Sequence, residues 1–213
     1  MPTHEYLRML KKQVSFFGRL KRVESRLLEE YFECASSLAD TSQNKLKPEY
    51  KHGHFLHTTR STVFLYWLSR SLFLADSKRR ETVGLAEKLF LLNRQLNSVD
   101  LHYGIQMPKH FLISHGLGVV LSRAHYGDYF SILQGVTVGV QDQKYPSFGE
   151  RVILLPNSVV VGNSFIGSNT IVGAGTVIVN KCIPENRVVI QRGGKLIIRE
   201  RDFENDLEYF IRS

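Results

Sequence analysis

Asp100 and His115 are the two side chains of this sequence whose types best fit acid–base chemistry. An imidazole with an ordinary pKa of about 6.5 is mostly neutral at pH 7, so it can take a proton from a hydroxyl group. A carboxylate on the far ring nitrogen would fix the tautomer and stabilise the imidazolium that forms. Such a pair would allow an alcohol to attack a carbonyl carbon directly. The plainer alternatives are a hydrogen-bonded surface histidine and an aspartate that caps the junction of two elements.

Other metal-binding or nucleophilic groups are poorly supported. His52, His54 and His57 lie close together, but no cysteine or carboxylate partner is evident, so we expect no metal site. Cys34 and Cys182 are the only cysteines and lie in different halves of the chain, which argues against a disulfide framework or a zinc site. Cys182 falls at an interior position of the repeat described next, where a small core side chain is expected.

A six-residue repeat runs through the second half of the chain. Apolar residues recur at every sixth position, namely Phe148, Leu154, Val160, Ile166, Val172 and Ile178. Small or medium side chains stand four residues after each of these: Val152, Ser158, Ser164, Thr170, Thr176 and Cys182. Hexads repeated in register predict a parallel β-helix, in which each hexad forms a short strand and a corner while the apolar residue fills the interior.

The repeat is less regular upstream of Phe148. A less strict six-residue step runs from Leu101 to Ile113 and, after a one-residue slip, from Val120 to Val138, but the next step, from Val138 to Phe148, is ten residues long. About four extra residues are therefore extruded as a loop near 139–147. Insertions in a solenoid gather on one face and frequently carry function.

The first hundred residues follow a helical pattern. Only three of the sixteen glycines precede residue 100, and apolar residues recur at helical spacing over about 3–38, 60–75 and 79–97. A stretch near 41–58 is expected to connect these helices. The sequence thus predicts an α+β protein with a helical domain at 1–98, a β-helix domain at 99–190, and a tail with a short helix at 191–213.

Three strings of residues resemble bacterial serine acetyltransferases, which belong to the hexapeptide-repeat acyltransferases. The strings are Val99-Asp100-Leu101-His102, Ile113-Ser114-His115-Gly116 and Ser131-Ile132-Leu133-Gln134-Gly135-Val136-Thr137-Val138-Gly139. The fifteen-residue gap from Asp100 to His115 equals the family's gap between its paired catalytic residues. The resemblance covers roughly residues 60–185. It implies a left-handed β-helix, acetyl-CoA as co-substrate without a metal, His115 as catalytic base with Asp100, and homotrimers or dimers of trimers with active sites between subunits.

The same resemblance implies further binding residues. Backbone near Gly139, Val140, Pro156 and Ala174 would line the pantetheine arm of the co-substrate, and N–H groups near Gly139 would stabilise a tetrahedral oxyanion. The basic residues that follow the last coil would lie where the phosphates of the co-substrate pass: Arg187, Arg192 and Lys195.

The departures from the family concern the acceptor. Ser114 replaces an aspartate before the catalytic histidine, Tyr145 replaces a second histidine in the loop, and Lys144 precedes it. A Gly-Val-Pro-Ala stretch is replaced by residues 190–195. Because catalytic residues are kept and serine-recognition residues are not, we expect transfer to another hydroxyl, that of a carbohydrate and in particular of a capsular or other surface polysaccharide. Ser114, Lys144 and Tyr145 would contact this acceptor.

Charge and composition narrow the function classes. The net charge is +8, and its excess is mostly N-terminal, which favours an acidic acceptor. We expect no nucleic-acid partner, no transmembrane segment and a cytoplasmic location, because the sequence has no nucleic-acid motif, no apolar run of membrane length and no secretory signal. Serine O-acetylation, N-acetylation of a sugar amine and a non-catalytic β-helix scaffold remain as alternatives.

Overall fold

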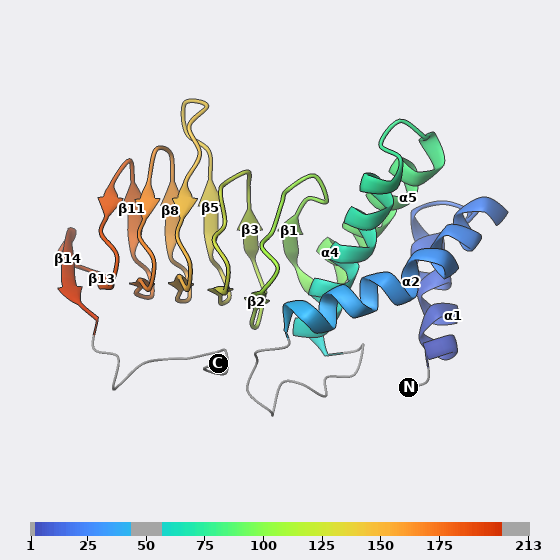
Figure 1. The fold of residues 1–213 in the computed structure, drawn as a ribbon, viewed down its shortest axis with the longest axis horizontal. Coiled ribbons are helices and arrows are strands. Elements are labelled where there is room, and N and C mark those ends of the chain that lie inside the picture. The colour runs from blue at the N-terminus through green and yellow to red at the C-terminus, as the bar shows by residue number, and fades with distance from the viewer. Residues whose placement is uncertain (1–2, 44–56, 202–213) are drawn as a thin grey trace.

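A computed structural model describes residues 3–43 and 57–201 and shows a bundle of helices at one end of a β-solenoid (Figure 1). The helical elements are α1 (Thr3–Val14), the 3-10 turn η1 (Ser15–Phe17), α2 (Arg22–Ser42), α4 (Thr58–Ala75) and α5 (Arg80–Asn97). The helices predicted over 60–75 and 79–97 are thereby confirmed. No helix within the described ranges is both long and apolar enough to cross a membrane.

The apolar pattern over 3–38 belongs to two helices and not to one. The chain leaves the helical path at η1, and Gly18 adopts φ 116°, a conformation that side chains other than glycine rarely take. At residue 21 the α2 helix starts with a reciprocal cap, in which the Lys21 N–H donates to Glu24 Oε2 at 2.7 Å. Spacing alone does not reveal such a break, because the apolar stripe resumes on the far side.

The helical half and the solenoid share one hydrophobic core. The Tyr66 hydroxyl of α4 donates to the Ile105 carbonyl at 2.7 Å and accepts from the Met107 N–H at 3.1 Å. Arg70 Nη1 donates to the Tyr103 carbonyl at 2.9 Å. Three contacts from one helix therefore anchor the first coil of the solenoid.

The solenoid consists of short strands that pair in parallel between successive coils. They are β1 (Val99–Leu101), β2 (Phe111–Ile113), β3 (Val119–Leu121), β4 (Phe130–Ile132), β5 (Thr137–Gly139), β6 (Ser147–Phe148), β7 (Ile153–Leu154), β8 (Val159–Val161), β9 (Phe165–Ile166), β10 (Ile171–Val172), β11 (Val177–Val179) and β12 (Cys182–Ile183). Two longer strands, β13 (Arg187–Arg192) and β14 (Lys195–Glu200), close the C-terminal end.

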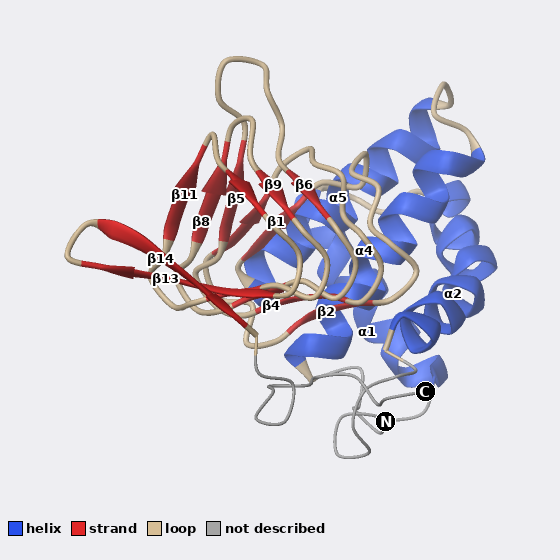
Figure 2. Ribbon diagram, turned by 60° about the vertical axis from the view of Figure 1, so that its left-hand side comes forward, coloured by secondary structure: helices blue, strands red, loops and turns tan. Residues whose placement is uncertain are grey.

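Three sheets form the walls of the solenoid. We call them S1 (order β1-β3-β5-β8-β11), S2 (β6-β9-β12) and S3 (β2-β4-β7-β10-β13-β14). Each complete coil passes from S1 to S2 to S3 and back to S1, so three rows of turns run along the solenoid. These rows are the S1–S2 edge, the S2–S3 edge and the S3–S1 edge, and their separation decides which site residues can meet (Figure 2).

The hexad prediction is confirmed in the core. All six apolar hexad residues from Phe148 to Ile178 have no exposed surface. Ser158, Ser164, Thr170 and Thr176 are also buried. Cys182 was predicted to be interior, and this is wrong: its side chain is exposed. Its coil is one residue shorter than three hexads, so Cys182 pairs with Phe165, which also faces outward, while Ile183 takes the interior position beside Ile166.

The C-terminal region differs from the predicted short helix where it is described. Residues 187–200 form an antiparallel hairpin, β13–β14, which projects from the solenoid in Figure 2. Gly193 and Gly194 both take positive φ at its tip. The rest of the predicted tail, from residue 202, lies outside the described residues. The hairpin begins before residue 190, which was the predicted end of the β-helix domain.

Candidate functional site

His115 lies on the S3–S1 edge, in the turn between β2 and β3. Its side chain is exposed, and its backbone has φ 52°, a left-handed conformation that histidine adopts more readily than most residues. Gly116 follows because a Cβ there would lie 2.7 Å from Val99 Cγ2, closer than atoms can pack. The turn therefore holds the imidazole outside the solenoid, where it can meet a substrate.

The S3–S1 edge is otherwise free of ionisable side chains. Its four turns span residues 114–118, 133–136, 155–158 and 173–176, and His115 is the one titratable residue among them. An edge of this kind presents a neutral, glycine-rich surface with a single base. Such a surface suits an uncharged ligand better than a charged one.

Asp100 occupies the centre of β1, on the outer face of S1. Its neighbours Val99 and Leu101 are buried, and Asp100 itself is half-buried. The carboxylate forms an ion pair with Arg94, with 3.6 Å between Oδ2 and Nη2. It lines a shallow hollow of about 260 Å³ with Arg94 and Gly118. Within one copy of the described chain, no hydrogen bond joins Asp100 to His115, so the predicted pair is not closed in this state.

Ser114, the residue predicted to replace a family aspartate, is buried beneath the same turn. Its N–H donates to the Ile132 carbonyl at 2.9 Å, which ties the turn to the next coil. The placement of Ser114 suits support of the His115 turn, and its predicted contact with an acceptor stays a prediction.

The extra residues between β5 and β6 form a hairpin of their own, here called the finger (residues 140–146). In Figure 1 it stands out above β5 and β8. Gln141 and Lys144 exchange two backbone hydrogen bonds of 3.2 and 2.9 Å around Asp142 and Gln143, both with positive φ. The predicted extruded loop is thus confirmed, and it is a tight turn held by its own backbone.

Two further contacts anchor the finger to the solenoid. The Asn180 side chain donates to Gln141 Oε1 at 3.2 Å, and the Pro146 carbonyl accepts from the His125 N–H at 3.1 Å. Arg123, from the turn of the preceding coil, lies over the Tyr145 ring with Cζ 5.6 Å from its centroid. Arg123 was absent from the predicted site, because nothing in the hexad pattern singles out a residue in a turn.

Apart from Asp100, which lies on sheet S1 itself, the predicted site residues fall into three groups on one copy. Ser114, His115, Pro156 and Ala174 lie on or under the S3–S1 edge. Gly139, Val140, Lys144 and Tyr145 lie at the S1–S2 edge. Arg187, Arg192 and Lys195 belong to the C-terminal hairpin. One copy therefore does not bring the base and the finger together, because sheet S1 separates them.

The base of the C-terminal hairpin adjoins the S3–S1 edge. Gln191 Oε1 accepts a hydrogen bond of 3.0 Å from the Val177 N–H, at the start of the last S1 strand. Ile190 packs beside Gly173 of the preceding turn. The basic side chains of the hairpin thus continue the row of turns that starts at His115 and passes Pro156 and Ala174.

Sheet S1 has an apolar outer face between its two edges. Val120, Val177 and Val179 are 41%, 42% and 38% exposed, and Val140 at the adjoining edge is 42% exposed. An apolar surface of this kind is typical of a protein–protein contact.

A histidine–carboxylate pair that the sequence analysis missed lies on the S2–S3 edge. His110 Nδ1 is 2.8 Å from Asp128 Oδ2, and the His110 N–H donates to Asp128 Oδ1 at 2.7 Å. The His110 ring stacks on Tyr129 at 4.7 Å, and Arg151 Cζ lies 4.8 Å from the Tyr129 centroid. The eighteen residues from His110 to Asp128 equal three hexads, which is the signal that could have revealed the pair. The stack joins three consecutive coils and stabilises this edge.

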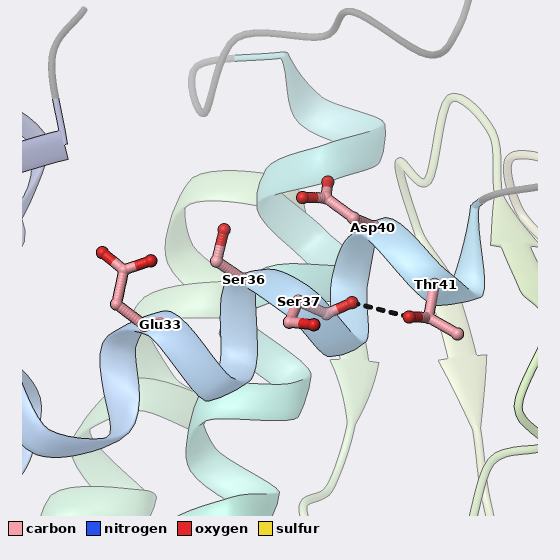
Figure 3. A pocket seen from close by; sticks show the side chains of 5 residues that line it. All are labelled: Glu33, Ser36, Ser37, Asp40 and Thr41. Atoms are coloured by element: carbon pink, nitrogen blue, oxygen red, sulfur yellow. Dashed lines mark hydrogen bonds between the residues drawn. The ribbon is translucent and has the colours of Figure 1, made fainter.

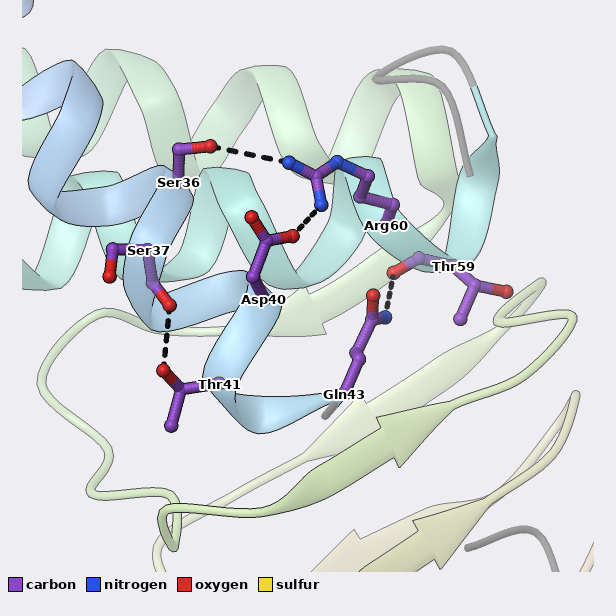
Figure 4. Close-up of polar contacts among 7 residues, drawn as sticks. All are labelled: Ser36, Ser37, Asp40, Thr41, Gln43, Thr59 and Arg60. Atoms are coloured by element: carbon purple, nitrogen blue, oxygen red, sulfur yellow. Dashed lines mark hydrogen bonds and ion pairs between the residues drawn. The ribbon is translucent and has the colours of Figure 1, made fainter. Parts of the chain in front are cut away.

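A larger polar hollow of about 400 Å³ lies on α2 in the helical half. Figure 3 shows its lining side chains along one face of the helix: Glu33, Ser36, Ser37, Asp40 and Thr41. The polar groups are largely used in packing. Arg60 of α4 pairs with Asp40 and donates to Ser36 Oγ at 3.2 Å, and Thr41 donates to the Ser37 carbonyl (Figure 4). The hollow contains neither a histidine nor a thiol and is a surface where α2 and α4 meet.

The described residues contain no group of three or more histidine, cysteine or acidic side chains able to hold a metal ion. His57 precedes α4, whereas His52 and His54 lie outside the described residues.

Comparison with known proteins gives consistent results. No family model matches the sequence. The chain is 30% identical over 110 residues to a serine acetyltransferase of Staphylococcus xylosus, covering 49% of this chain and 50% of the relative. It is 35% identical over 118 residues to a serine acetyltransferase of Mycobacterium tuberculosis, covering 53% and 51%. The chain thus spans about half the length of these curated relatives.

Solved structures extend the likeness to the helices. Serine acetyltransferase from Neisseria gonorrhoeae aligns with a TM-score of 0.65 at 22% identity, over 84% of this chain and 71% of that one. Serine acetyltransferase from Brucella abortus in complex with coenzyme A aligns with a TM-score of 0.63 at 19% identity, over 83% and 72%. At such identities the alignments show a shared fold.

Proposed function

We propose that this chain is an acetyl-CoA-dependent O-acetyltransferase with His115 as general base, because it is 30% and 35% identical to two serine acetyltransferases over about half of its length. The observation that carries the proposal is the exposed imidazole on an edge with no other ionisable side chain. A non-catalytic scaffold has no need of a single exposed base on a neutral surface. Deprotonation of an alcohol does need such a base.

The reaction needs one base and no protein nucleophile. The imidazole of His115 takes the hydroxyl proton while the acceptor oxygen attacks the thioester carbonyl carbon. The tetrahedral intermediate then collapses, the C–S bond breaks, and the imidazolium returns its proton to the leaving thiolate. Asp100 would orient the ring, and N–H groups near Gly139 would stabilise the oxyanion.

Acetyl-CoA fits the S3–S1 edge and its continuation. The pantetheine arm is uncharged, as are the turns that contain Pro156 and Ala174. The nucleotide carries phosphates, and the row of turns ends at the basic hairpin, where Arg192 pairs in register with Lys195. A neutral row of turns that ends in cations matches a neutral arm that ends in phosphates. The named relative from Brucella abortus binds coenzyme A.

The proposed active site is shared between copies in a trimer. His115 and the finger lie on opposite edges of S1, whose outer face is apolar between them. If three copies bury this face around a threefold axis, the S3–S1 edge of one copy meets the S1–S2 edge of the next. Light scattering would then give the mass of a trimer, or of a hexamer if the helical halves also pair.

L-serine is the acceptor that the comparisons favour, since the relatives named above are serine acetyltransferases. A carbohydrate hydroxyl is the second candidate. It is supported by the replacement of serine-recognition residues by Ser114 and Tyr145, and by the basic hairpin in place of the family's C-terminal stretch. A capsular or other surface polysaccharide, our expectation from the sequence, has no support among the compared proteins.

Thiol release from acetyl-CoA tests the proposal. Wild-type protein is assayed with L-serine and with a panel of neutral and acidic sugars and polysaccharides, beside His115→Ala. We expect acceptor-dependent release that falls at least about 100-fold in the variant, as for the loss of a general base, with the circular dichroism spectrum unchanged. Full turnover by folded His115→Ala would refute the mechanism, and no release with any acceptor would favour a non-catalytic scaffold.

A further inference from the structure

The two edges of S1 differ sharply in charge. The S3–S1 turns contain no lysine, arginine, aspartate or glutamate. The S1–S2 turns at residues 122–125, 140–146, 162–164 and 180–181 carry Arg123, Lys144 and Lys181 against Asp142 alone. A cleft between one edge and its counterpart on a neighbouring copy would have one neutral wall and one positive wall. The positive wall selects for negative charge on whichever substrate contacts it.

Arg123 is the best-placed cation on this wall. Its guanidinium lies over the Tyr145 ring, at a distance within the range of a cation–π contact. Its N–H donors make no hydrogen bond or ion pair with any described residue. The stack restricts the long side chain while leaving the donors available. Arginine in this state binds a carboxylate through two parallel hydrogen bonds.

The rigidity of the finger gives this arrangement a fixed position. The tight turn at Asp142 and Gln143, the bond from Asn180 and the bond to Pro146 hold Tyr145 at the base of the finger. His125, two residues after Arg123, is exposed on the same turn and adds no negative charge. Asp142 is the one acidic group on the finger, and it lies at the tip, beyond the Gln141–Lys144 pair.

We infer that Arg123, held against Tyr145, binds a carboxylate of the acceptor and so determines which acceptors are used. This inference rests on the proposed function, because it assigns the positive edge to the acceptor side of that reaction. It applies to both candidate acceptors, since L-serine and an acidic sugar each carry a carboxylate close to the hydroxyl group. The competing assignment is that the cations of the S1–S2 edge bind the phosphates of acetyl-CoA. In the proposed function those phosphates are bound by the C-terminal hairpin instead.

Matched acceptor pairs test the assignment in the full-length protein. Wild type, Arg123→Ala and Arg123→Lys are assayed with L-serine against L-serinamide, and with glucuronate against glucose. Arg151→Ala is the matched control, because it removes another arginine that lies over a tyrosine ring, on the S2–S3 edge. The KM for acetyl-CoA is measured for every variant.

The expected result is selective. Arg123→Ala lowers kcat/KM for the carboxylate acceptor about 10- to 100-fold, mostly through KM, as for the loss of a charge-assisted pair of hydrogen bonds. The neutral member of the pair, the KM for acetyl-CoA and Arg151→Ala change less than about threefold. Arg123→Lys lies between, because it keeps the charge and loses the bidentate geometry. If the serine pair responds, the carboxylate is that of an amino acid; if the glucuronate pair responds, it is that of an acidic sugar.

Several outcomes would overturn the inference. Equal losses on charged and neutral acceptors, a rise in the KM for acetyl-CoA, or no change in Arg123→Ala would each remove Arg123 from the acceptor site while leaving the proposed function standing. If wild type released no thiol, the proposed function would fail separately. Calorimetric titration with L-serine and glucuronate would then decide: binding lost in Arg123→Ala supports the inference, and equal or absent binding in wild type and variant contradicts it.

Discussion

The Tyr66→Phe substitution measures how firmly the helical half holds the first coil of the solenoid. It removes one oxygen atom, which donates to the Ile105 carbonyl at 2.7 Å and accepts from the Met107 N–H at 3.1 Å. The ring and its edge-on contact with Phe111 remain. Two hydrogen bonds are lost at about 1 kcal/mol each, and the buried groups left unpaired add to this. We expect a loss of about 2–3 kcal/mol in the free energy of unfolding.

Urea unfolding followed by circular dichroism and by the fluorescence of Trp67, the single tryptophan, gives this quantity. Tyr31→Phe is the control, because the hydroxyl of Tyr31 has no hydrogen-bond partner among the described residues. The two signals should unfold together, and the melting temperature of Tyr66→Phe should fall by about 4–10 °C. A loss no greater than that of Tyr31→Phe would show that these bonds do not join the two halves.

Three further results are expected. Phe148→Ala should cost about 3–5 kcal/mol in urea unfolding because its ring fills the solenoid interior, whereas the exposed Phe165→Ala should cost under 1 kcal/mol; equal costs would contradict the core assignment. Burial raises the pKa of Tyr66 to about 12, so between about pH 10 and 12 the native protein keeps the phenol proton that the unfolded protein loses. The free energy of unfolding should therefore fall over this pH range, and it should fall less steeply in Tyr66→Phe. Asp100→Asn should lower kcat about tenfold or more with little change in KM; an unchanged pH–rate profile would remove Asp100 from the mechanism.

The solenoid could be predicted from the sequence because its interior accepts one apolar side chain per wall. The apolar residues at every sixth position from Phe148 to Ile178 are all buried in this interior. The strands at the C-terminus also had a signal that was not used: Gly193 and Gly194 separate two runs rich in β-branched residues, a pattern typical of a β-hairpin. Cys182 stands at a hexad position of the sequence, but the last coil is one residue shorter than three hexads, so Cys182 pairs with the outward-facing Phe165 and not with the buried Ser164.

The candidate site was harder to predict than the fold. Sequence spacing placed Asp100 and His115 on adjacent strands and turns, yet it does not tell which edge of a three-sided solenoid a residue occupies. The sequence therefore does not tell that S1 lies between the finger and His115 within one copy. Arg123 and the pair of His110 with Asp128 depend on contacts between coils, which become visible once the coils are stacked.

Subunit complementation tests the shared active site most directly. His115→Ala is refolded in equal amounts with a variant whose finger is shortened by removing residues 141–144, each being inactive alone. If base and finger come from different copies, about one quarter of the interfaces in randomly mixed trimers combine an intact His115 with an intact finger. The account predicts recovery of about a quarter of wild-type acetyl transfer, and a mixture as inactive as its components would contradict it.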